Sequence, residues 1–491
     1  MSTDPNHFSP HSHPRESGSA REAASPRERL RAILYEGLHT DVGRLTVFPG
    51  RITPIASIWT GARQWVNFFR ASGLTHGTRV VLALGPSPAF LMAMIAAWWE
   101  GLSLIVLREG EPVPDALDAS VIIRAESCGT DLRVIAPNPD WGPPEKPIRP
   151  PTTRLGPSPD VRLMLRTSGT SGNPRWIALS DENIAAVIES HRPHLGLRGA
   201  RVLSALPWHH AFGLLIDLVP ALLDAETIVR EPSAGRDPGS IIEAVERWEI
   251  THLSMVPLQV CRIAALPGGR SVLAGLRGGV VGGAKITQDI SDLLTGSTLR
   301  VGYGQTEASP GIALGAPGVW REGILGAACG CELRADDAGV LQFRGPNACL
   351  GHWTERGLER WADGWRSTGD LVRAERGQFV YLGRADDSFK LANGRLVVPG
   401  PIESRLAEIV PDVIDAAVLS RDGESIDVVL VTRSAIARPI ALVARALGPL
   451  APKLGEVRVL TQHNVPRSAK GSLDRAQLAR YLEDPGARAA A

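Results

Sequence analysis

Residues 163–179 read LMLRTSGTSGNPRWIAL: a short apolar run, a loop of hydroxyl and glycine residues, and a second apolar run. The first run, Leu163–Leu165, predicts a buried strand that ends at the loop. Glycine lets backbone N–H groups turn toward an anion, and Ser and Thr side chains add donors. A phosphate-binding loop is therefore one interpretation, and an ordinary turn between strands is the other. A Walker A loop is excluded because no Gly-Lys-Ser/Thr follows.

The composition is that of an ordinary globular protein. The chain has 491 residues, 44% of them hydrophobic and 21% charged, and this length predicts two or three domains. The formal net charge of +1 gives no electrostatic case for binding nucleic acid or an anionic membrane. The five cysteines form no CxxC pair and no His/Cys ladder, so neither a zinc site nor a disulfide framework is indicated.

The amino-terminal stretch lacks a core-forming pattern. Residues 1–27 are rich in Ser, Pro, His and Arg, which predicts a disordered tail and does not fit a signal peptide. The most apolar segment, Val80–Leu107, is interrupted by glycine, proline and glutamate, so it does not fit a single transmembrane helix. We therefore expect a soluble, cytoplasmic protein with no membrane span.

Strands and helices alternate along most of the chain. Val80–Leu84, Phe90–Glu100 and Ser103–Leu107 read as strand, helix and strand, a βαβ unit that implies a parallel sheet. The alternation continues to about residue 303 and predicts a large α/β domain with doubly wound sheets. From about residue 318, short strands with turn signals predict a small β-rich subdomain. Beyond the polar junction at 383–387, about a hundred residues read as a compact α+β piece.

Five separated motifs occur in order: TSGTSGNP (167–174), PWHHAFGL (207–214), GYGQTE (302–307), STGDL (367–371) and GRADDSFKLANG (383–394). With them the chain resembles the adenylate-forming superfamily of acyl-CoA synthetases, peptide-synthetase adenylation domains and beetle luciferases, over about residues 30–480. The resemblance implies an N-terminal AMP-binding domain over residues 28–384, after the tail of 1–27. It also implies a small, mobile C-terminal lid domain over residues 385–491.

The resemblance implies a two-step reaction. A carboxylate attacks the α-phosphate of ATP to give an acyl-adenylate and pyrophosphate, and the acyl group then passes to a thiol. Because two anions meet, cations and oriented donors must offset the developing charge. The expected cofactors are ATP, Mg²⁺ and, as acceptor, coenzyme A or phosphopantetheine. The expected partners are a small carboxylic acid and a discrete acyl carrier protein.

The motifs imply roles for individual residues at the nucleotide. Thr306 would touch the α-phosphate, and Glu307 would hold Mg²⁺, a cation that favours carboxylate oxygen. Tyr303 would lie against the adenine, Asp370 would accept hydrogen bonds from the ribose hydroxyls, and Arg384 would support ribose and phosphates. The loop would wrap the β- and γ-phosphates, so the remaining nucleotide-binding candidates are Thr167, Ser168, Gly169, Thr170, Ser171, Gly172, Gly283, Ala284 and Gly304.

The resemblance also places an acid pocket beside the adenylate. His210 would lie near the carboxylate as a catalytic candidate, with a core histidine as the alternative. The other implied walls are Trp208, Phe212, Val256, Gly283, Ala284 and Ala308. Amino-acid-activating members hold an α-ammonium with a Phe-Asp pair that is not evident in PWHHAFGLLID, and Asp217 is a poor substitute. We therefore expect an aryl or aliphatic acid without that amine.

The two half-reactions would use one cleft in turn. The resemblance implies that the C-terminal domain rotates about Asp386 and that Lys390 then faces the adenylate for thiolation. The superfamily's last motif carries a lysine that bridges the acid and ATP during adenylation. Here Ser472 occupies that place, and Lys470 lies two residues earlier. If this segment is extended, positions two apart share a face, so Lys470 is the candidate substitute.

Two further substitutions lie at the loop exit, where the usual Lys-Gly is Arg175-Trp176. Arginine keeps the charge but not the point geometry of an ammonium.

Three interpretations stay open. The first is an AMP-forming acid–thiol ligase. The second is an adenylate-forming ligase that uses an amine, another nucleophile or an unusual oxyacid. The third is a binding protein on a degenerate synthetase fold, or an enzyme that performs only thiolation.

Overall fold

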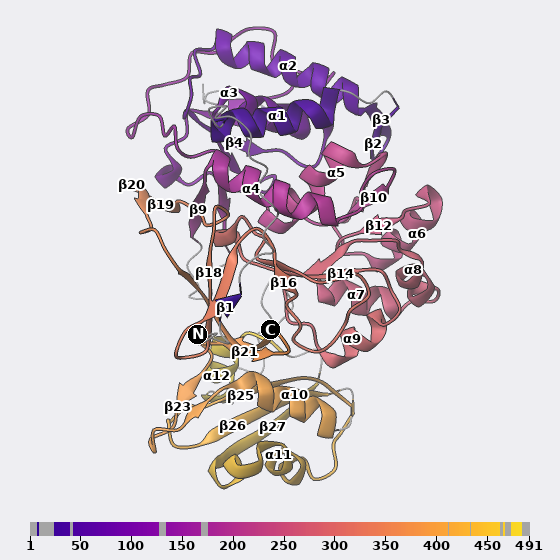
Figure 1. Ribbon diagram of the computed structural model, residues 1–491, viewed down its shortest axis with the longest axis vertical. Helices are drawn as coiled ribbons and strands as arrows, with labels where there is room; N and C mark the ends of the chain where they lie inside the picture. Colours follow the sequence, from indigo (N-terminus) through magenta and orange to yellow (C-terminus); the bar gives the residue numbers. More distant parts are fainter. Residues whose placement is uncertain are drawn as a thin grey trace, which may run out of the picture.

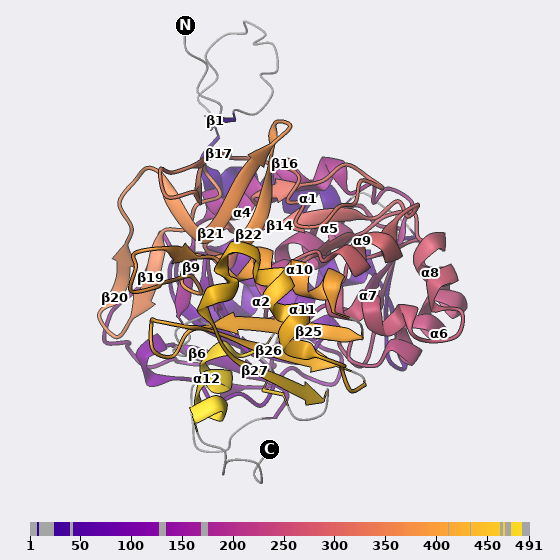
Figure 2. The ribbon, with the colours of Figure 1, turned by 90° about the horizontal axis from the view of Figure 1, so that it is seen from below.

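The computed structural model describes residues 7–8, 24–39, 43–126, 134–167, 175–410, 412–432, 434–461, 465–466 and 473–483. A large N-terminal domain holds four sheets, and a smaller C-terminal domain follows β22 (Gln378–Arg384) (Figure 1). Seen from below, the C-terminal domain lies across one end of the N-terminal domain (Figure 2). The predicted α/β class is confirmed. No helix among the described residues is long and apolar enough to cross a membrane.

The largest sheet has eight strands in the order β20-β19-β9-β8-β5-β4-β6-β7. Their bounds are β4 Arg79–Ala83, β5 Ser103–Val106, β6 Val121–Arg124, β7 Val134–Ile135, β8 Leu163–Arg166, β9 Trp176–Leu179, β19 Gly351–Thr354 and β20 Gly357–Arg360. The five strands from β8 to β7 are parallel, which confirms the predicted βαβ unit. β9, β19 and β20 extend the sheet by antiparallel pairing.

Helices α2 (Ile55–Ala71) and α3 (Pro88–Glu100) pack together beside this sheet. α3 is buried on all sides, as its almost uninterrupted apolar sequence requires. The Ser87 Oγ accepts a hydrogen bond from the Phe90 N–H and starts the helix, and Gly101 ends it at φ 78°. α1 (Pro26–His39) begins inside the predicted tail of 1–27.

Two further sheets lie side by side in the N-terminal domain. Their orders are β12-β10-β11-β2-β3 and β13-β14-β15-β16, and parallel bridges from His252 to Gly278 and from Met255 to Val281 connect them. The bounds are β2 Leu45–Phe48, β3 Arg51–Pro54, β10 Arg201–Ser204, β11 Thr227–Arg230, β12 His252–Leu253, β13 Val280–Gly282, β14 Arg300–Tyr303, β15 Ala313–Leu314 and β16 Ala327–Ala328.

Helices separate these strands along the chain. They are α4 Asp181–His191, α5 Val219–Asp224, α6 Pro238–Trp248, α7 Pro257–Ala264, α8 Gly269–Gly275 and α9 Gln288–Leu294. The Ser180 side chain caps α4 by accepting a hydrogen bond from the Asn183 N–H. A π-helical segment, η3 (Phe212–Leu218), precedes α5. π-Helical turns are rare and occur often at functional sites.

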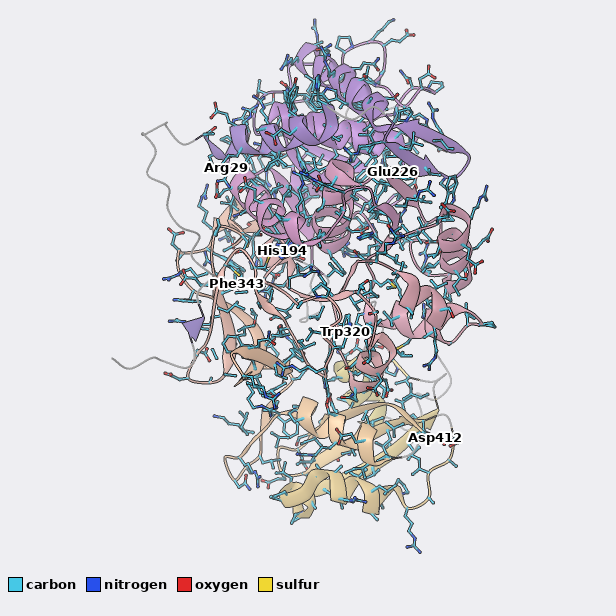
Figure 3. The ribbon with its side chains drawn as sticks, turned by 45° about the vertical axis from the view of Figure 1, so that its right-hand side comes forward. Arg29, His194, Glu226, Trp320, Phe343 and Asp412 are labelled. Atoms are coloured by element: carbon cyan, nitrogen blue, oxygen red, sulfur yellow. The ribbon has the colours of Figure 1, made fainter. Side chains whose placement is uncertain are left out.

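The predicted β-rich subdomain is an antiparallel sheet. It consists of β17 (Glu332–Ala335), β18 (Val340–Arg344), β21 (Arg366–Glu375) and β22, and β1 (His7–Phe8) pairs with β17. The buried side chain of Phe343 belongs to its core (Figure 3).

The C-terminal domain is a three-stranded sheet with helices. The strands are β25 Val413–Leu419, β26 Ile426–Thr432 and β27 Leu454–Thr461, and the helices are α10 Pro399–Ile409, α11 Pro439–Leu447 and α12 Arg475–Glu483. A two-stranded ribbon of β23 (Phe389–Lys390) and β24 (Leu396–Val397) precedes them. Figure 3 shows Trp320 on the N-terminal side of the boundary between the domains and Asp412 within the C-terminal domain.

Candidate active site

The serine- and glycine-rich loop leaves β8 and returns into β9. The Thr167 N–H donates to the Arg175 carbonyl at 2.8 Å, so these two residues close the base of the loop. Ser168, Gly169, Thr170, Ser171 and Gly172 lie outside the described residues, and their phosphate-binding role stays a prediction. The side chain of Trp176 is buried in a cluster that includes Trp353. The indole therefore packs into the sheet instead of standing beside the loop.

The turn that carries Thr306 and Glu307 is tied to the strand leaving this loop. Both residues lie in a short 3₁₀ helix, η4 (Thr306–Ala308), which follows β14 and Gly304. The Glu307 carbonyl accepts a hydrogen bond from the Cys349 N–H at 2.9 Å, and the Leu350 N–H donates to the Ala178 carbonyl on β9 at 2.9 Å. Cys349 and Leu350 thus connect the GYGQTE motif to the strand that follows the TSGTSGNP motif, although the two motifs are more than a hundred residues apart.

Asp370 is the centre of the predicted nucleotide site. Its Oδ2 accepts a hydrogen bond from the Tyr303 hydroxyl at 2.6 Å, and its Oδ1 accepts one from Arg384 Nη1 at 2.9 Å. The Asp370 N–H donates to the Thr368 hydroxyl at 3.1 Å, and Arg384 also donates to the Thr368 carbonyl at 2.8 Å. The structure therefore brings together three of the predicted nucleotide-binding residues from β14, β21 and β22.

The electrostatics of this group follow from its burial and its charges. Burial and the adjacent Asp370 carboxylate raise the pKa of Tyr303 well above its ordinary value, so the phenol stays a donor. Asp370 is itself buried, and the guanidinium of Arg384 balances its charge. The Tyr303 hydroxyl bonds the carboxylate, a contact that the prediction of a ring against adenine did not include.

Glu307 is the predicted Mg²⁺ ligand. Among the described residues no group of three or more His, Cys, Asp or Glu side chains could hold a metal ion. A single carboxylate fits Mg²⁺ nonetheless, because this cation commonly binds one or two carboxylates together with substrate phosphates and water. The role of Glu307 stays a prediction.

Three of the predicted acid-pocket residues converge. Gly283 follows β13 at φ 86°, and a Cβ placed on it would lie 3.6 Å from Val256 Cγ1 and 4.0 Å from Phe212 Cδ1. The space above Gly283 is thus bounded by two apolar side chains. Ala284 is the next residue along the chain, and Lys285 follows it.

The other predicted pocket residues lie differently. Trp208 is buried, packs edge-on against Phe48, and donates from Nε1 to the Ser204 hydroxyl at 2.9 Å. Ala308 is buried in the core of the β-rich subdomain. His210 is exposed, and its ring centroid lies 4.4 Å from that of His209. Burial and the neighbouring His210, Arg108 and Arg230 lower the pKa of His209 to about 4.

A buried polar cluster that the sequence did not reveal lies behind Trp208. Asp217 on η3 is 3% exposed, and burial raises its pKa to about 7 against the opposing effect of hydrogen bonds with Ser254 and Ser204. Arg230 on β11 donates to the Ser204 carbonyl at 2.8 Å and lies over the Trp208 ring. Asp217 is therefore a carboxyl group of the protein interior, and its Oδ2 has no hydrogen-bond partner among the described residues.

The predicted hinge and thiolation residues lie on the exposed side of the domain junction. Asp386 is exposed and accepts from Arg384 Nη2 at 3.3 Å. Lys390 is exposed on β23, which pairs with β24 alone among the described strands. The structure does not bring Lys390 to Asp370, and its role in a rotated state stays a prediction.

The last motif is anchored beside the hinge. Lys470 and Ser472 lie outside the described residues, and the Asp474 N–H donates to the Pro466 carbonyl at 3.0 Å across the segment that contains them. Arg475 donates to both carboxylate oxygens of Glu403 on α10, at 2.6 and 2.8 Å, and lies 3.4 Å from Asp387. Arg475 is therefore held beside Asp387, the residue next to Asp386.

A second polar contact crosses the domain boundary. Lys285 Nζ lies 2.8 Å from Glu322 and donates to the Ser404 hydroxyl on α10 at 2.6 Å. The Ser404 hydroxyl also donates to Glu322 at 2.5 Å. Because Lys285 directly follows Gly283 and Ala284, this contact connects the pocket wall to the C-terminal domain.

Comparison with known proteins identifies a family and relatives with similar sequences. The family model described as AMP-binding enzyme matches residues 55–344. A feruloyl-CoA synthase from Amycolatopsis sp is 30% identical over 377 residues, 69% of this chain and 75% of that protein. An indoleacetate–CoA ligase from Aromatoleum aromaticum is 29% identical over 55% of this chain and 56% of that protein.

Solved structures agree on the fold. The anthranilate CoA ligase AuaEII in complex with anthranoyl-AMP matches with a TM-score of 0.76 at 20% identity, over 93% of this chain and 98% of that chain. The amide bond synthetase McbA from Marinactinospora thermotolerans also gives 0.76 at 20% identity, over 93% of this chain and 100% of that chain. At this level of identity the two structures support the fold alone. They do not indicate whether the acceptor is a thiol or an amine.

Proposed function

The chain belongs to the AMP-binding enzyme family, within the adenylate-forming superfamily, and we propose that it activates a carboxylic acid as an acyl-adenylate and transfers it to coenzyme A. The observation that carries this proposal is the group around Asp370. A buried carboxylate, a phenol and a guanidinium meet where three of the separated motifs converge. The two carboxylate oxygens can accept from ribose hydroxyls while Arg384 faces the phosphates.

We propose an aromatic acid without an α-ammonium group as the substrate class. Phe212 and Val256 lie against Gly283, so this wall of the predicted acid pocket is apolar and partly aromatic, as an aromatic acid requires. Asp217 is buried, and burial raises its pKa to about 7, so it does not offer a reliably charged partner for an ammonium group. The names of the relatives support this class, since ferulate and indoleacetate are aromatic acids.

In this proposal ATP, when bound, supplies the α-phosphate that accepts the carboxylate, and Mg²⁺ offsets the phosphate charge. Thr306 donates toward the α-phosphate, and Glu307 supplies a carboxylate oxygen to the cation. Thr167 and Arg175 close the loop that would surround the outer phosphates with backbone N–H groups. Each residue thus binds or orients a charged group.

The substitution at Ser472 favours a second candidate, an enzyme that performs thiolation well and adenylation poorly. Serine cannot supply the charge of the superfamily's lysine, whereas Lys390 is retained. If Lys470 reaches the acid and the α-phosphate in place of that lysine, the first candidate is favoured. If it does not, the second candidate is favoured.

One assay tests the proposal. The protein is incubated with ATP, Mg²⁺ and a panel of aromatic, aliphatic and amino acids, with and without coenzyme A, and both pyrophosphate and acyl-CoA are measured. The proposal expects acyl-CoA with at least one aromatic acid and none with the matched amino acid. Pyrophosphate without acyl-CoA would favour a different acceptor, and no pyrophosphate with any acid would contradict adenylation.

A further inference from the structure

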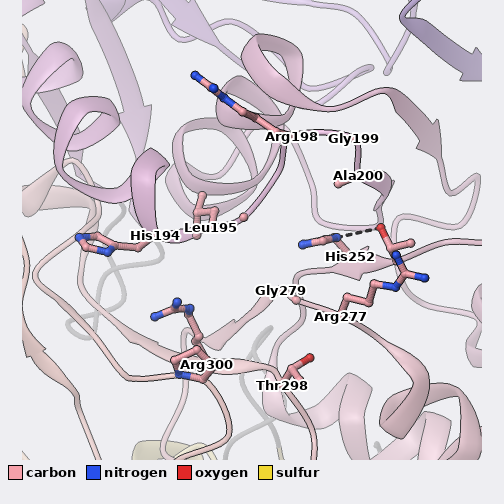
Figure 4. A pocket seen from close by; sticks show the side chains of 14 residues that line it. His194, Leu195, Arg198, Gly199, Ala200, His252, Arg277, Gly279, Thr298 and Arg300 are labelled. Atoms are coloured by element: carbon pink, nitrogen blue, oxygen red, sulfur yellow. Dashed lines mark hydrogen bonds between the residues drawn. The ribbon is translucent and has the colours of Figure 1, made fainter.

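A hollow of about 310 Å³ lies in the N-terminal domain at the amino-terminal edge of the two neighbouring sheets (Figure 4). Its walls come from the segment before β10, the start of β12, the residues before β13 and the start of β14. Glycines form much of the wall: Gly196, Gly199, Gly278 and Gly279. The volume is at the lower end of the range for small-molecule sites.

The charged side chains around this hollow are all basic. Arg198, Arg277 and Arg300 line it together with the imidazoles of His194 and His252, and no Asp or Glu does so among the described residues. Figure 4 shows Arg300 and His252 on opposite sides of the hollow, with Arg277 nearby. Asp217 lines an adjoining small cavity but not the hollow itself.

These cations lack counter-charges within the described chain. The structure gives neither Arg198 nor Arg277 a carboxylate within ion-pair distance among the described residues, and the contact it gives Arg300 Nη1 is with the Gly315 carbonyl at 3.0 Å. The His252 Nδ1 lies 2.8 Å from the Thr251 hydroxyl, which leaves Nε2 toward the glycines. Burial and the adjacent Arg277 lower the pKa of His252. Like charges gathered around a concave surface raise the local concentration of anions.

The hollow is separate from the candidate active site. β13 and β14 are parallel, and both run from the hollow toward the adenylate residues. Arg300 begins β14 at the hollow and Tyr303 ends it at Asp370, three residues or about 10 Å further along the strand. Gly279 precedes β13 at the hollow, and Gly283 follows it at the acid pocket.

We propose that this hollow is a binding site for a small soluble anion that carries phosphate groups, such as pyrophosphate or a phosphorylated metabolite. Arginine forks pair with phosphate oxygens through two parallel hydrogen bonds, and several arginines together suit a multiply charged anion better than a single carboxylate. The concave shape and small volume fit a soluble compound, whereas an RNA or a membrane would need an extended basic face. The net charge of only +1 for the whole chain agrees with a local site.

Calorimetric titration with inorganic pyrophosphate tests this site with three proteins. The first is the wild-type chain, and the second is Arg277→Gln/Arg300→Gln. The third is Arg262→Gln/Arg270→Gln, which removes two exposed charges elsewhere on the surface. Binding at the candidate active site contributes equally to all three. Arg277→Gln alone is measured as well, because Arg277 is exposed and its replacement disturbs no ion pair given by the structure.

The proposal expects two binding events in the wild type and in the surface control. In the pocket variants the affinity of one of these events should fall by about tenfold or more for each arginine removed, because each arginine contributes hydrogen bonds to a charged group. A crystal soaked in pyrophosphate should show the anion between Arg277 and Arg300. Identical isotherms for all the proteins would overturn the proposal. A second result would also overturn the proposal: Arg277-dependent binding to vesicles of phosphatidic acid, together with no binding of pyrophosphate.

Discussion

Replacing Asp370 by asparagine keeps the shape of the side chain and removes its charge. In the native site both carboxylate oxygens accept, one from Tyr303 at 2.6 Å and one from Arg384 at 2.9 Å. An amide offers one accepting oxygen and one donating nitrogen, so at least one of these contacts is lost. Arg384 keeps only its longer contact with Asp386, at 3.3 Å, as a balancing carboxylate.

The expected cost follows from the loss of a charged acceptor. Hydrogen bonds to charged groups contribute about 1.5–3 kcal/mol each, and each 1.4 kcal/mol is tenfold in affinity. Losing one accepting oxygen for a ribose hydroxyl should therefore raise the KM for ATP by about 10- to 150-fold. The KM for the acid should change little, because the residues around Gly283 are untouched.

The assay is acid-dependent pyrophosphate release at varied ATP. Asp224→Asn is the matched control, since Asp224 forms the same kind of paired contact with Arg192, at 2.6 and 2.7 Å, away from the site. Its KM for ATP should equal that of the wild type. If Asp370→Asn is folded and its KM for ATP stays within twofold of the wild type, the nucleotide role of Asp370 is refuted.

Three further predictions concern the lid, the domain contact and pH. Lys470→Ala should slow pyrophosphate release by orders of magnitude, and Ser472→Lys should speed it; an unchanged rate in Lys470→Ala would exclude the substitute-lysine hypothesis. Lys285→Met should increase limited proteolysis at the hinge about two- to fivefold, the size expected for a half-exposed ion pair, whereas Lys453→Met in an exposed pair should not. Burial lowers the pKa of His191 to about 4 from 6.5, so between these values the unfolded chain binds the extra proton and stability falls as pH falls. From pH 7.5 to 5 this histidine should remove about 2 kcal/mol of unfolding free energy, so the loss that urea titration finds over this range should be smaller by about 2 kcal/mol in His191→Gln, in which His209 still titrates.

Local sequence patterns predicted the local structure well. The run from Val80 to Leu107 gave β4, α3 and β5, because its apolar stretches are short for the strands and longer for the helix, and Gly and Pro residues separate them. The motifs at 302–307 and 367–371 also met at one site, as the resemblance implied. β14 and β21 belong to different sheets, so strand spacing alone does not predict this meeting, and only the resemblance implied it.

Contacts between distant segments could not be predicted from local sequence patterns. β19 and β20 join the largest sheet through β9, some 175 residues earlier in the chain, and no local pattern specifies that pairing. The basic hollow has the same origin: its arginines are single cations spread over residues 198–300, and only the sheet edge gathers them. The hydrogen bond between Tyr303 and Asp370 and the burial of Trp208 likewise depend on packing that a motif does not encode.

Acid-dependent exchange of labelled pyrophosphate into ATP reports adenylate formation without the thiol step. We expect exchange that requires Mg²⁺ and an aromatic acid, and that falls strongly in Asp370→Asn. ATP binding without exchange for any acid in the panel would contradict it and would leave a nucleotide-binding protein in place of an acid-activating enzyme.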